Sequence, residues 1–256
     1  MEKTCYEEFG HLVLMAIFDT VDDTKLVGKA VLGELQEVFS KVAADKYGLR
    51  VIKYLMGGRD SAYTYPDTLA LLQRGDGNAM SKKAPEVRRA ELLEAIAPTV
   101  LKWVVENLQG GLFIPPTTIT FTCILNHLPA SPQLTRVWGL LAEEAAKPFI
   151  QGDDTPNIVE ATASSMLLKK VILKDKARAA AGEEVFAKVL LSTVDEEGVT
   201  SWVSCNRGCF LLVNCWETGV AEVQELVREK VQPVLATLRR QKEKMKGAEI
   251  LLTKLG

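Results

Sequence analysis

The side chains in this sequence that could do chemistry are mainly cationic, and they gather in short clusters. The clusters are, in chain order, Lys82, Lys83, Arg88 and Arg89, then Lys169 to Arg178, then Arg239, Arg240, Lys242, Lys244 and Lys246. Ammonium and guanidinium groups suit contact with phosphates, which hold a nucleic acid without reading its sequence. Similar clusters also occur on solvated helix faces that bind nothing, so both interpretations stay open for each one.

The charge of the whole chain is close to balanced. Its 256 residues include 31 Lys and Arg and 33 Asp and Glu, for a net charge of −2. Many nucleic-acid-binding domains are strongly basic, so such a function would here depend on local clustering. The hydrophobic share of 47% supports a folded core. No apolar run approaches the roughly 20 residues of a membrane span, and we expect a soluble, intracellular protein with no membrane partner.

Residues for metal or nucleophilic chemistry are sparse. The five cysteines include no Cys-x-x-Cys pair, which fits free thiols in a reducing compartment. Cys205 and Cys209 stand four apart, but His11 and His127 are the only histidines in the sequence, so buried free cysteines are favoured over a zinc site. Gly75-Asp76-Gly77 does not match a phosphate-binding loop. We therefore expect no enzyme, no cofactor and no metal.

A repeat is the most informative pattern in the sequence. It is a small residue followed by apolar residues three, four and seven positions later, which forms one stripe on a helix. Four copies are clear: Gly10 with Val13, Leu14 and Ile17; Gly48 with Val51, Ile52 and Leu55; Ser164 with Leu167, Leu168 and Val171; and Gly208 with Leu211, Leu212 and Cys215. Weaker copies begin at Gly247, with Ile250 and Leu251, and at Thr118, with Phe121 and Leu125. A period near 40 residues predicts an all-α solenoid of stacked helical repeats.

Longer amphipathic segments lie between the copies and predict further helices. One runs from Lys25 to Val42 after the capping residues Asp22-Asp23-Thr24. Another occupies 131–147, opening on Ser131-Pro132 and ending before Pro148. Segment 84–108 contains Pro98, where we expect a kink or a break. The β-branched run 114–120 contains two prolines, at 115 and 116, and is expected to be an extended connector that leads into a helix. Segments 57–83 and 148–157 are expected to be loops.

Several of these segments resemble the Puf-A proteins, which are nucleolar relatives of pumilio. The resemblance is dense from about 9 to 97. It is carried by Phe9-Gly10-His11-Leu12-Val13-Leu14-Met15-Ala16-Ile17-Phe18-Asp19, by Asp45-Lys46-Tyr47-Gly48-Leu49-Arg50-Val51, and by Gly75-Asp76-Gly77-Asn78-Ala79-Met80-Ser81-Lys82-Lys83 with Glu86-Val87-Arg88-Arg89. Farther along, Asn206-Arg207-Gly208 and the ending Gly247-Ala248-Glu249-Ile250-Leu251-Leu252 are similar to the last two repeats of the family.

The resemblance implies a pumilio-like helical-repeat solenoid, curved into a superhelix. Pumilio-like repeats would occupy 1–97, with the loop 57–83, and a CPL-type region would occupy about 98–256. Because family members begin with a basic extension and further repeats, we expect this chain to be the C-terminal half of a longer protein. Where relatives have Gly-His, this chain has Ser164-Ser165, which keeps the apolar stripe but departs from the family pattern.

Well-characterised pumilio repeats read one base per repeat with a pair of edge-binding side chains and a stacking side chain. The resemblance places these one, two and five positions after the small residue. The positions are His11, Leu12 and Met15; Leu49, Arg50 and Lys53; Ser165, Met166 and Lys169; Cys209, Phe210 and Val213; and Ala248, Glu249 and Leu252. No repeat has the amide and carboxylate pairs that read base edges, although His11 or Cys209 could make isolated contacts.

The resemblance therefore implies sequence-tolerant binding of RNA, or of DNA, through phosphate contacts. The residues predicted to bind are Lys46, Arg50, Lys53, Lys82, Lys83, Arg88, Arg89, Lys169, Lys170 and Arg207. Implied partners are pre-ribosomal RNA, messenger RNA in some members, and ribosome-assembly proteins, bound by a monomer. The implied role is assembly of the large ribosomal subunit in the nucleolus of the nucleus, with translational regulation in some members. The alternative is a helical scaffold that binds protein partners alone.

Overall fold

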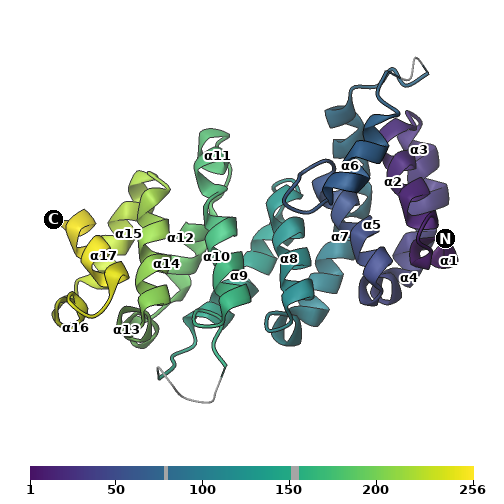
Figure 1. The fold of residues 1–256 in the computed structure, drawn as a ribbon. Coiled ribbons are helices and arrows are strands. Elements are labelled where there is room, and N and C mark those ends of the chain that lie inside the picture. The colour runs from purple at the N-terminus through teal and green to yellow at the C-terminus, as the bar shows by residue number, and fades with distance from the viewer. Residues whose placement is uncertain (78–79, 151–155) are drawn as a thin grey trace. The chain divides into compact units, whose positions relative to one another are not determined.

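The structure is a computed structural model that describes residues 1–77, 80–150 and 156–256 (Figure 1). Within those ranges every regular element is a helix and no strand occurs, which confirms the predicted all-α class. None of the described helices is long and apolar enough to cross a membrane. The chain forms two compact units, one from Met1–Glu106 with Cys123–Pro129 and the other from Asn107–Thr122 with Ala130–Gly256.

The first unit is built from the N-terminal helices. These are α1 (Glu2–Tyr6), α2 (Gly10–Thr20), α3 (Thr24–Val27), the π-helical turn η1 (Gly28–Leu32), α4 (Gly33–Ala44), α5 (Lys46–Gly57) and α6 (Pro66–Gln73), with parts of α7 (Pro85–Gly111) and α8 (Pro115–His127). Helix α5 packs against both α2 and α4. The predicted helix at 25–42 is present as α3, η1 and α4, and the Asp23 carboxylate caps it by accepting a 2.9 Å hydrogen bond from Leu26 N–H.

The second unit contains the remaining parts of α7 and α8 and the C-terminal helices. These are α9 (Pro132–Ala146), α10 (Thr162–Ile172), α11 (Asp175–Ala180), α12 (Phe186–Thr193), α13 (Glu196–Ser204), α14 (Asn206–Glu217), α15 (Ala221–Val231), α16 (Leu235–Gln241) and α17 (Lys246–Leu255). Helix α14 packs against α10, α13, α15 and α17. Ser131 caps α9 as the sequence predicts, because its hydroxyl accepts a 3.2 Å hydrogen bond from Leu134 N–H.

The small residue of the repeat lies where two consecutive helices turn sharply against each other. A single residue, Asp45, joins α4 to α5, and its carboxylate accepts a 2.9 Å hydrogen bond from Gly48 N–H. Cys205 joins α13 to α14 in the same way and accepts from Gly208 N–H at 3.2 Å. A Cβ on Gly48 would overlap the carbonyl of the preceding helix. The repeat therefore requires a small residue there because the two helices approach so closely.

The apolar stripes supply much of the core of each unit, although Ile17 and Ile250 are half-buried and Val13 is exposed. Leu14, Val51, Ile52, Leu167, Leu168, Leu211 and Leu212 are all at most 4% exposed, which confirms their prediction as core. The three residues of the Thr118 copy, Thr118, Phe121 and Leu125, are also buried. The prediction for Val13 is wrong, because Val13 is 55% exposed. On α2 the buried face is His11, Leu14, Met15 and Phe18, so the stripe starts one residue later than the glycine pattern indicates.

Two of the connector predictions also need correction, and of the kink or break expected at Pro98 the break is absent. Segment 57–83 is not all loop, because Pro66 opens the short helix α6. The run 114–120 is not an extended connector, because α8 begins at Pro115 and the Thr118 and Thr120 hydroxyls bond carbonyls four residues back. Helix α7 continues through Pro98 without a break. Residues 148–150 and 156–157 lie outside helices as predicted, and the other residues of that expected loop fall outside the described ranges.

Candidate nucleic-acid interface

Helix α5 places three of the predicted basic residues on one face. Lys46, Arg50 and Lys53 are spaced by four and three residues, so their side chains leave the helix on the same side. Lys46 is exposed, and Arg50 and Lys53 are half-buried. Within the described residues none of the three forms an ion pair or a side-chain hydrogen bond. Their charges are therefore available to an external anion.

Aromatic rings surround Arg50 on this face. Its guanidinium carbon lies 4.6 Å from the centroid of the Tyr65 ring and 5.2 Å from that of Tyr47. The Lys46 ammonium lies 4.5 Å from the Tyr47 centroid, and the Tyr47 ring also stacks on His11 with centroids 4.7 Å apart. Cations over ring faces are attracted to the electron-rich π system. We call Lys46, Tyr47, Arg50, Lys53 and Tyr65 the α5 face.

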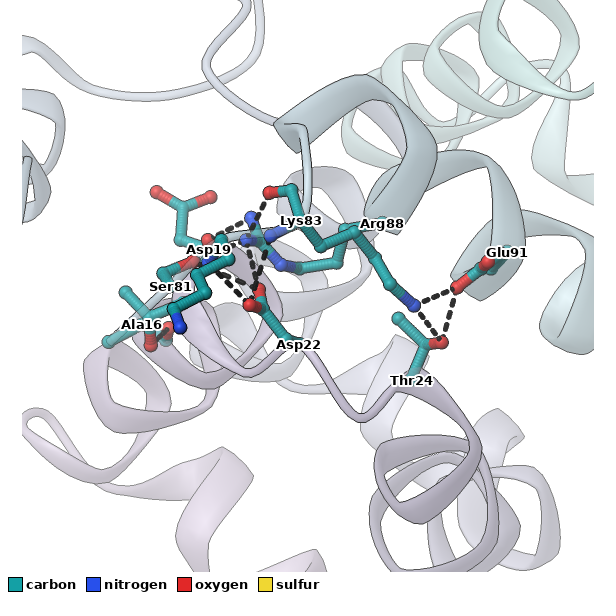
Figure 2. Close-up of polar contacts among 10 residues, drawn as sticks. Ala16, Asp19, Asp22, Thr24, Ser81, Lys83, Arg88 and Glu91 are labelled. Atoms are coloured by element: carbon teal, nitrogen blue, oxygen red, sulfur yellow. Dashed lines mark hydrogen bonds and ion pairs between the residues drawn. The ribbon is translucent and has the colours of Figure 1, made fainter. Parts of the chain in front are cut away.

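The cluster at Lys82 to Arg89 has a different character, because two of its cations point into the protein. Arg88 is 2% exposed, and its guanidinium pairs with the Asp22 carboxylate at 2.7 Å (Figure 2). It also donates to Ser81 Oγ at 2.5 Å, to the Lys83 carbonyl at 2.9 Å and to the Asp19 carbonyl. Bonding to Arg88 first, and then to the amides of Lys82 and Lys83, holds the pKa of Asp22 well below its usual range. This network ties the segment before α7 to the end of α2.

Arg89 and Lys83 also have structural partners. Arg89 donates to the carbonyls of Met56 and Gly57, at the C-terminal end of α5, where helix carbonyls lack partners within the helix. Burial lowers the pKa of Arg89. The Lys83 ammonium bonds Glu91 at 2.6 Å and the Thr24 hydroxyl at 3.1 Å, as Figure 2 shows. In this cluster the Lys82 side chain has no ion pair among the described residues.

The second unit has a small hollow, lined by two cationic side chains, between α10 and α14. Lys169 and Arg207 line it together with Phe210 and Asn214. Arg207 donates to the Thr162 hydroxyl at 2.9 Å and to the Glu160 carbonyl, which orients its exposed guanidinium. Lys169 is exposed on α10, and its neighbour Lys170 is half-buried. Nucleic-acid contact by any of the ten predicted residues stays a prediction.

Sequence reasoning missed the aromatic residues of the α5 face. The spacing of Tyr47 and Arg50, three residues apart on a predicted helix, is a signal that could have indicated their contact. Tyr65 gives no such signal, because it lies in the connector after α5 and reaches Arg50 only through the fold. Asn214 was missed because it lies six residues after the glycine of its repeat, outside the positions compared with pumilio.

The histidines and cysteines do not form a binding site on the surface. His11 is 2% exposed and Cys209 is 0% exposed, so burial removes the isolated base contacts predicted for them. Cys205 precedes α14 as its cap and accepts a hydrogen bond from Gly208 N–H, whereas Cys209 lies within α14. Burial raises the pKa of Cys209 to about 12 and that of Cys205 to about 11. Within the described part of the chain, no group of three His, Cys, Asp or Glu side chains could hold a metal ion.

Comparisons with known proteins agree on one family. The model of the CPL (NUC119) domain matches residues 44–184. Human Pumilio homolog 3 is 37% identical over the whole chain, and the Danio rerio protein of that name is 35% identical over 99% of it. The chain covers 40% of each of these relatives. The predicted division near residue 97 stays a prediction.

Solved structures show the same relationship. The crystal structure of human Puf-A matches with a TM-score of 0.85 at 36% identity, covering 99% of this chain and 49% of that one. A crystal structure of human Puf-A in complex with DNA matches with a TM-score of 0.83 at 35% identity, covering 98% and 48%. The predicted helical-repeat fold and family are thereby confirmed, and the chain belongs to the Puf-A family of pumilio homologues and contains its CPL (NUC119) domain.

Proposed function

We propose that this chain binds single-stranded nucleic acid, RNA above all, without selecting its sequence. The observation that carries the proposal is the α5 face, where three cations that form no ion pair with any described residue lie beside two tyrosine rings. Proteins that bind single-stranded nucleic acid without sequence preference usually combine two features. Cations lie along the phosphates of the nucleic acid, and aromatic rings stack on its bases. Stacking needs an unpaired base, which is why a single strand is favoured over a duplex.

The residues of the α5 face explain why sequence would matter little. Lys46, Arg50 and Lys53 can donate to phosphate oxygens, which are the same at every nucleotide. Tyr65 is 53% exposed and offers a ring that any base can cover. Reading a base edge takes paired donors and acceptors. In this repeat the two positions that correspond to the edge-binding pair of pumilio are Leu49 and Arg50, and the Leu49 side chain has neither a donor nor an acceptor.

The relatives support the proposal and extend it. One solved relative, human Puf-A, has been crystallised in complex with DNA. On the family resemblance, we further propose that the whole protein acts in large ribosomal subunit biogenesis in the nucleolus, bound to pre-ribosomal RNA and ribosome-assembly proteins. A role in translational regulation through messenger RNA, and a monomeric state, belong to the same proposal.

A salt titration with matched variants tests the binding mode. The test variant changes Lys46, Arg50 and Lys53 to Ala, and the control changes Lys25, Lys29 and Lys41 to Ala, which lie on α3, η1 and α4 of the same unit. Both variants lose three positive charges. Each phosphate contact on a single strand contributes about 0.7 to the slope of log affinity against log salt. The test variant should therefore flatten the slope by about two, and the control should leave it nearly unchanged.

The titration uses two scrambled single-stranded RNAs and one RNA duplex. The wild-type chain should bind both scrambled RNAs with similar affinity and the duplex less tightly. Strong discrimination between the scrambled RNAs would contradict sequence tolerance. Equal slopes in test and control variants would move the binding face away from α5, with Lys82 or the hollow at Lys169 and Arg207 as the next candidates. Undetectable binding at low salt would favour the scaffold alternative for this chain.

A further inference from the structure

A groove lined by apolar and acidic side chains lies in the second unit, and none of the basic residues discussed above lines it. It has a volume of about 850 Å³, within the size range of sites that hold ligands. Apolar groups line much of it: Phe113, Pro148, Phe149, Ile150, Pro156 and Ile158. Two of these are large side chains left in solvent, with Phe113 39% and Ile150 76% exposed. Hydrophobic side chains gathered and exposed in this way mark a contact surface.

The backbone beside the groove is held in place. The Ser201 hydroxyl on α13 accepts a 3.0 Å hydrogen bond from Phe149 N–H. The Asn157 side chain donates to the Lys147 carbonyl at 3.1 Å. Ile158, which follows Asn157 and also lines the groove, is 2% exposed. The exposed Ile150 therefore directly follows an anchored residue, so a partner could bury it without first ordering the backbone before it.

The charges beside the groove are mainly negative. Glu144 and Glu197 both line it, and Lys147 is the one cation among the described lining residues. Lys147 is already paired with Glu144 at 2.6 Å. Glu197 forms no ion pair with any described residue, and Glu196 beside it is exposed. An anionic polymer such as RNA would be repelled here, whereas a cationic peptide would be attracted.

We propose that this groove docks a short basic segment of a protein partner, whose one or two apolar side chains insert against Phe113 and Ile150 while a Lys or Arg pairs with Glu197. The apolar floor supplies the anchor for the inserted side chains, and the unpaired carboxylate selects the sign of the flanking charge. This surface is separate from the α5 face, so the proposal stands whether or not the chain binds RNA. It goes beyond the proposed nucleic-acid function by adding a protein partner of defined chemistry.

The test is fluorescence anisotropy with the whole chain and a panel of labelled peptides about twelve residues long. Each peptide carries a Phe and a Leu at a different separation, flanked by Lys and Arg. Control peptides keep the Phe and Leu but carry Glu flanks, or keep the basic flanks but carry Ser in place of both anchors. At least one basic, apolar peptide should bind with a Kd on the order of 10–100 μM, and both kinds of control should bind at least about tenfold more weakly.

Two variants with matched controls locate the site. Ile150→Ser should weaken the best peptide about tenfold, and Ile119→Ser, an exposed isoleucine on α8 that does not line the groove, should not. Glu197→Lys should weaken the basic peptide and strengthen the Glu-flanked one, and Glu229→Lys, exposed on α15, should change neither. Because Ile150 and Glu197 are surface residues, these changes should leave the fold intact, which circular dichroism checks.

Several outcomes would overturn the proposal. They are equal binding of basic and acidic peptides, no binding across the panel up to about 1 mM, or equal effects of the test and control variants. Competition with a single-stranded oligonucleotide separates this surface from the nucleic-acid site. If the oligonucleotide displaces the peptide and Ile150→Ser also weakens RNA binding, the groove belongs to the RNA site and the proposal is wrong. Retained RNA binding by Ile150→Ser and Glu197→Lys, together with lost peptide binding, would establish two separate sites.

Discussion

The guanidinium carbon of Arg50 lies 4.6 Å from the centroid of the Tyr65 ring, although Arg50 belongs to α5 and Tyr65 to the connector that follows it. The contact leaves Tyr65 53% exposed. A cation against one part of an aromatic ring restrains the ring while leaving the rest open to a base. For the proposed function, this contact would present a stacking surface that is already formed, which would reduce the ordering cost of binding.

Replacing Tyr65 should separate stacking from charge in RNA binding. Tyr65→Ala removes the ring, and loss of one stacked base costs about 1–3 kcal/mol, or a weakening of roughly fivefold or more. The salt slope should not change, because no phosphate contact is lost. Tyr65→Phe keeps the ring and should bind like the wild type. Anisotropy titrations at two salt concentrations measure both quantities, and a change of slope in Tyr65→Ala would show that the ring acts through its charged neighbours.

A methyl group at the repeat glycine should be harmful, and elsewhere on a helix it should help. A Cβ on Gly208 would overlap the backbone of Trp202 near the end of α13, so Gly208→Ala should destabilise the chain by about 3 kcal/mol. A Cβ on Gly139 of α9 would meet no atom of another element within 4 Å, so Gly139→Ala should stabilise by about 0.5–1 kcal/mol. Urea unfolding followed by circular dichroism measures both. Similar effects of the two changes would disprove the close-approach explanation of the repeat.

A buried and an exposed residue of the apolar stripes should differ in how much their replacement by Ala lowers the stability of the chain. Leu212 is fully buried on α14, and Leu212→Ala should cost about 2–5 kcal/mol because it leaves a cavity. Val13 belongs to the corresponding stripe on α2 but is 55% exposed, and Val13→Ala should change the free energy of unfolding by less than about 0.5 kcal/mol. Denaturant unfolding measures the free energy of unfolding of both variants. A large loss in Val13→Ala would mean that Val13 is buried within the folded chain, contrary to its 55% exposure.

The ion pair between Arg88 and Asp22 should contribute to stability. Arg88→Met leaves Asp22 without its principal partner and should cost about 3 kcal/mol, the lower end of the range for breaking a buried pair, because the Asp22 side chain keeps 29% exposure. Lys82→Met, in the same segment, removes a cation without an ion pair among the described residues and serves as the control, with an expected change below about 0.5 kcal/mol. Equal losses in the two variants would contradict the structural role of Arg88.

The same pair predicts a pH dependence with a defined sign. The pKa of Asp22 is lower in the folded chain than the ordinary value near 3.9 that applies after unfolding. Its stabilising effect is therefore complete at pH values above about 4 and is lost as the pH falls through the folded-state pKa. The difference in unfolding free energy between the wild type and Asp22→Asn should be constant from about pH 7 to 5 and shrink below about pH 4. A difference that grows on acidification would have the wrong sign.

The sequence by itself determined the all-α class and the repeat. Helical periodicity and capping are local, so the stripes after Gly48, Ser164 and Gly208 and the cap at Ser131 could be located from residues a few positions apart. The resemblance to Puf-A depended on the same short segments, and the family comparisons confirm it. Val13 shows where local reasoning fails, because the pattern gives the spacing of an apolar face but not which side of α2 meets a neighbour.

The tertiary structure alone decided which cations remain available for binding. Lys82, Lys83, Arg88 and Arg89 look alike in the sequence, yet Arg88 pairs with Asp22 across 66 positions and Arg89 bonds the carbonyl of Gly57 across 32. Tyr65 reached Arg50 in the same non-local way. Such partners depend on how helices far apart in the chain pack together, because a buried guanidinium must find its acceptors wherever the fold places them.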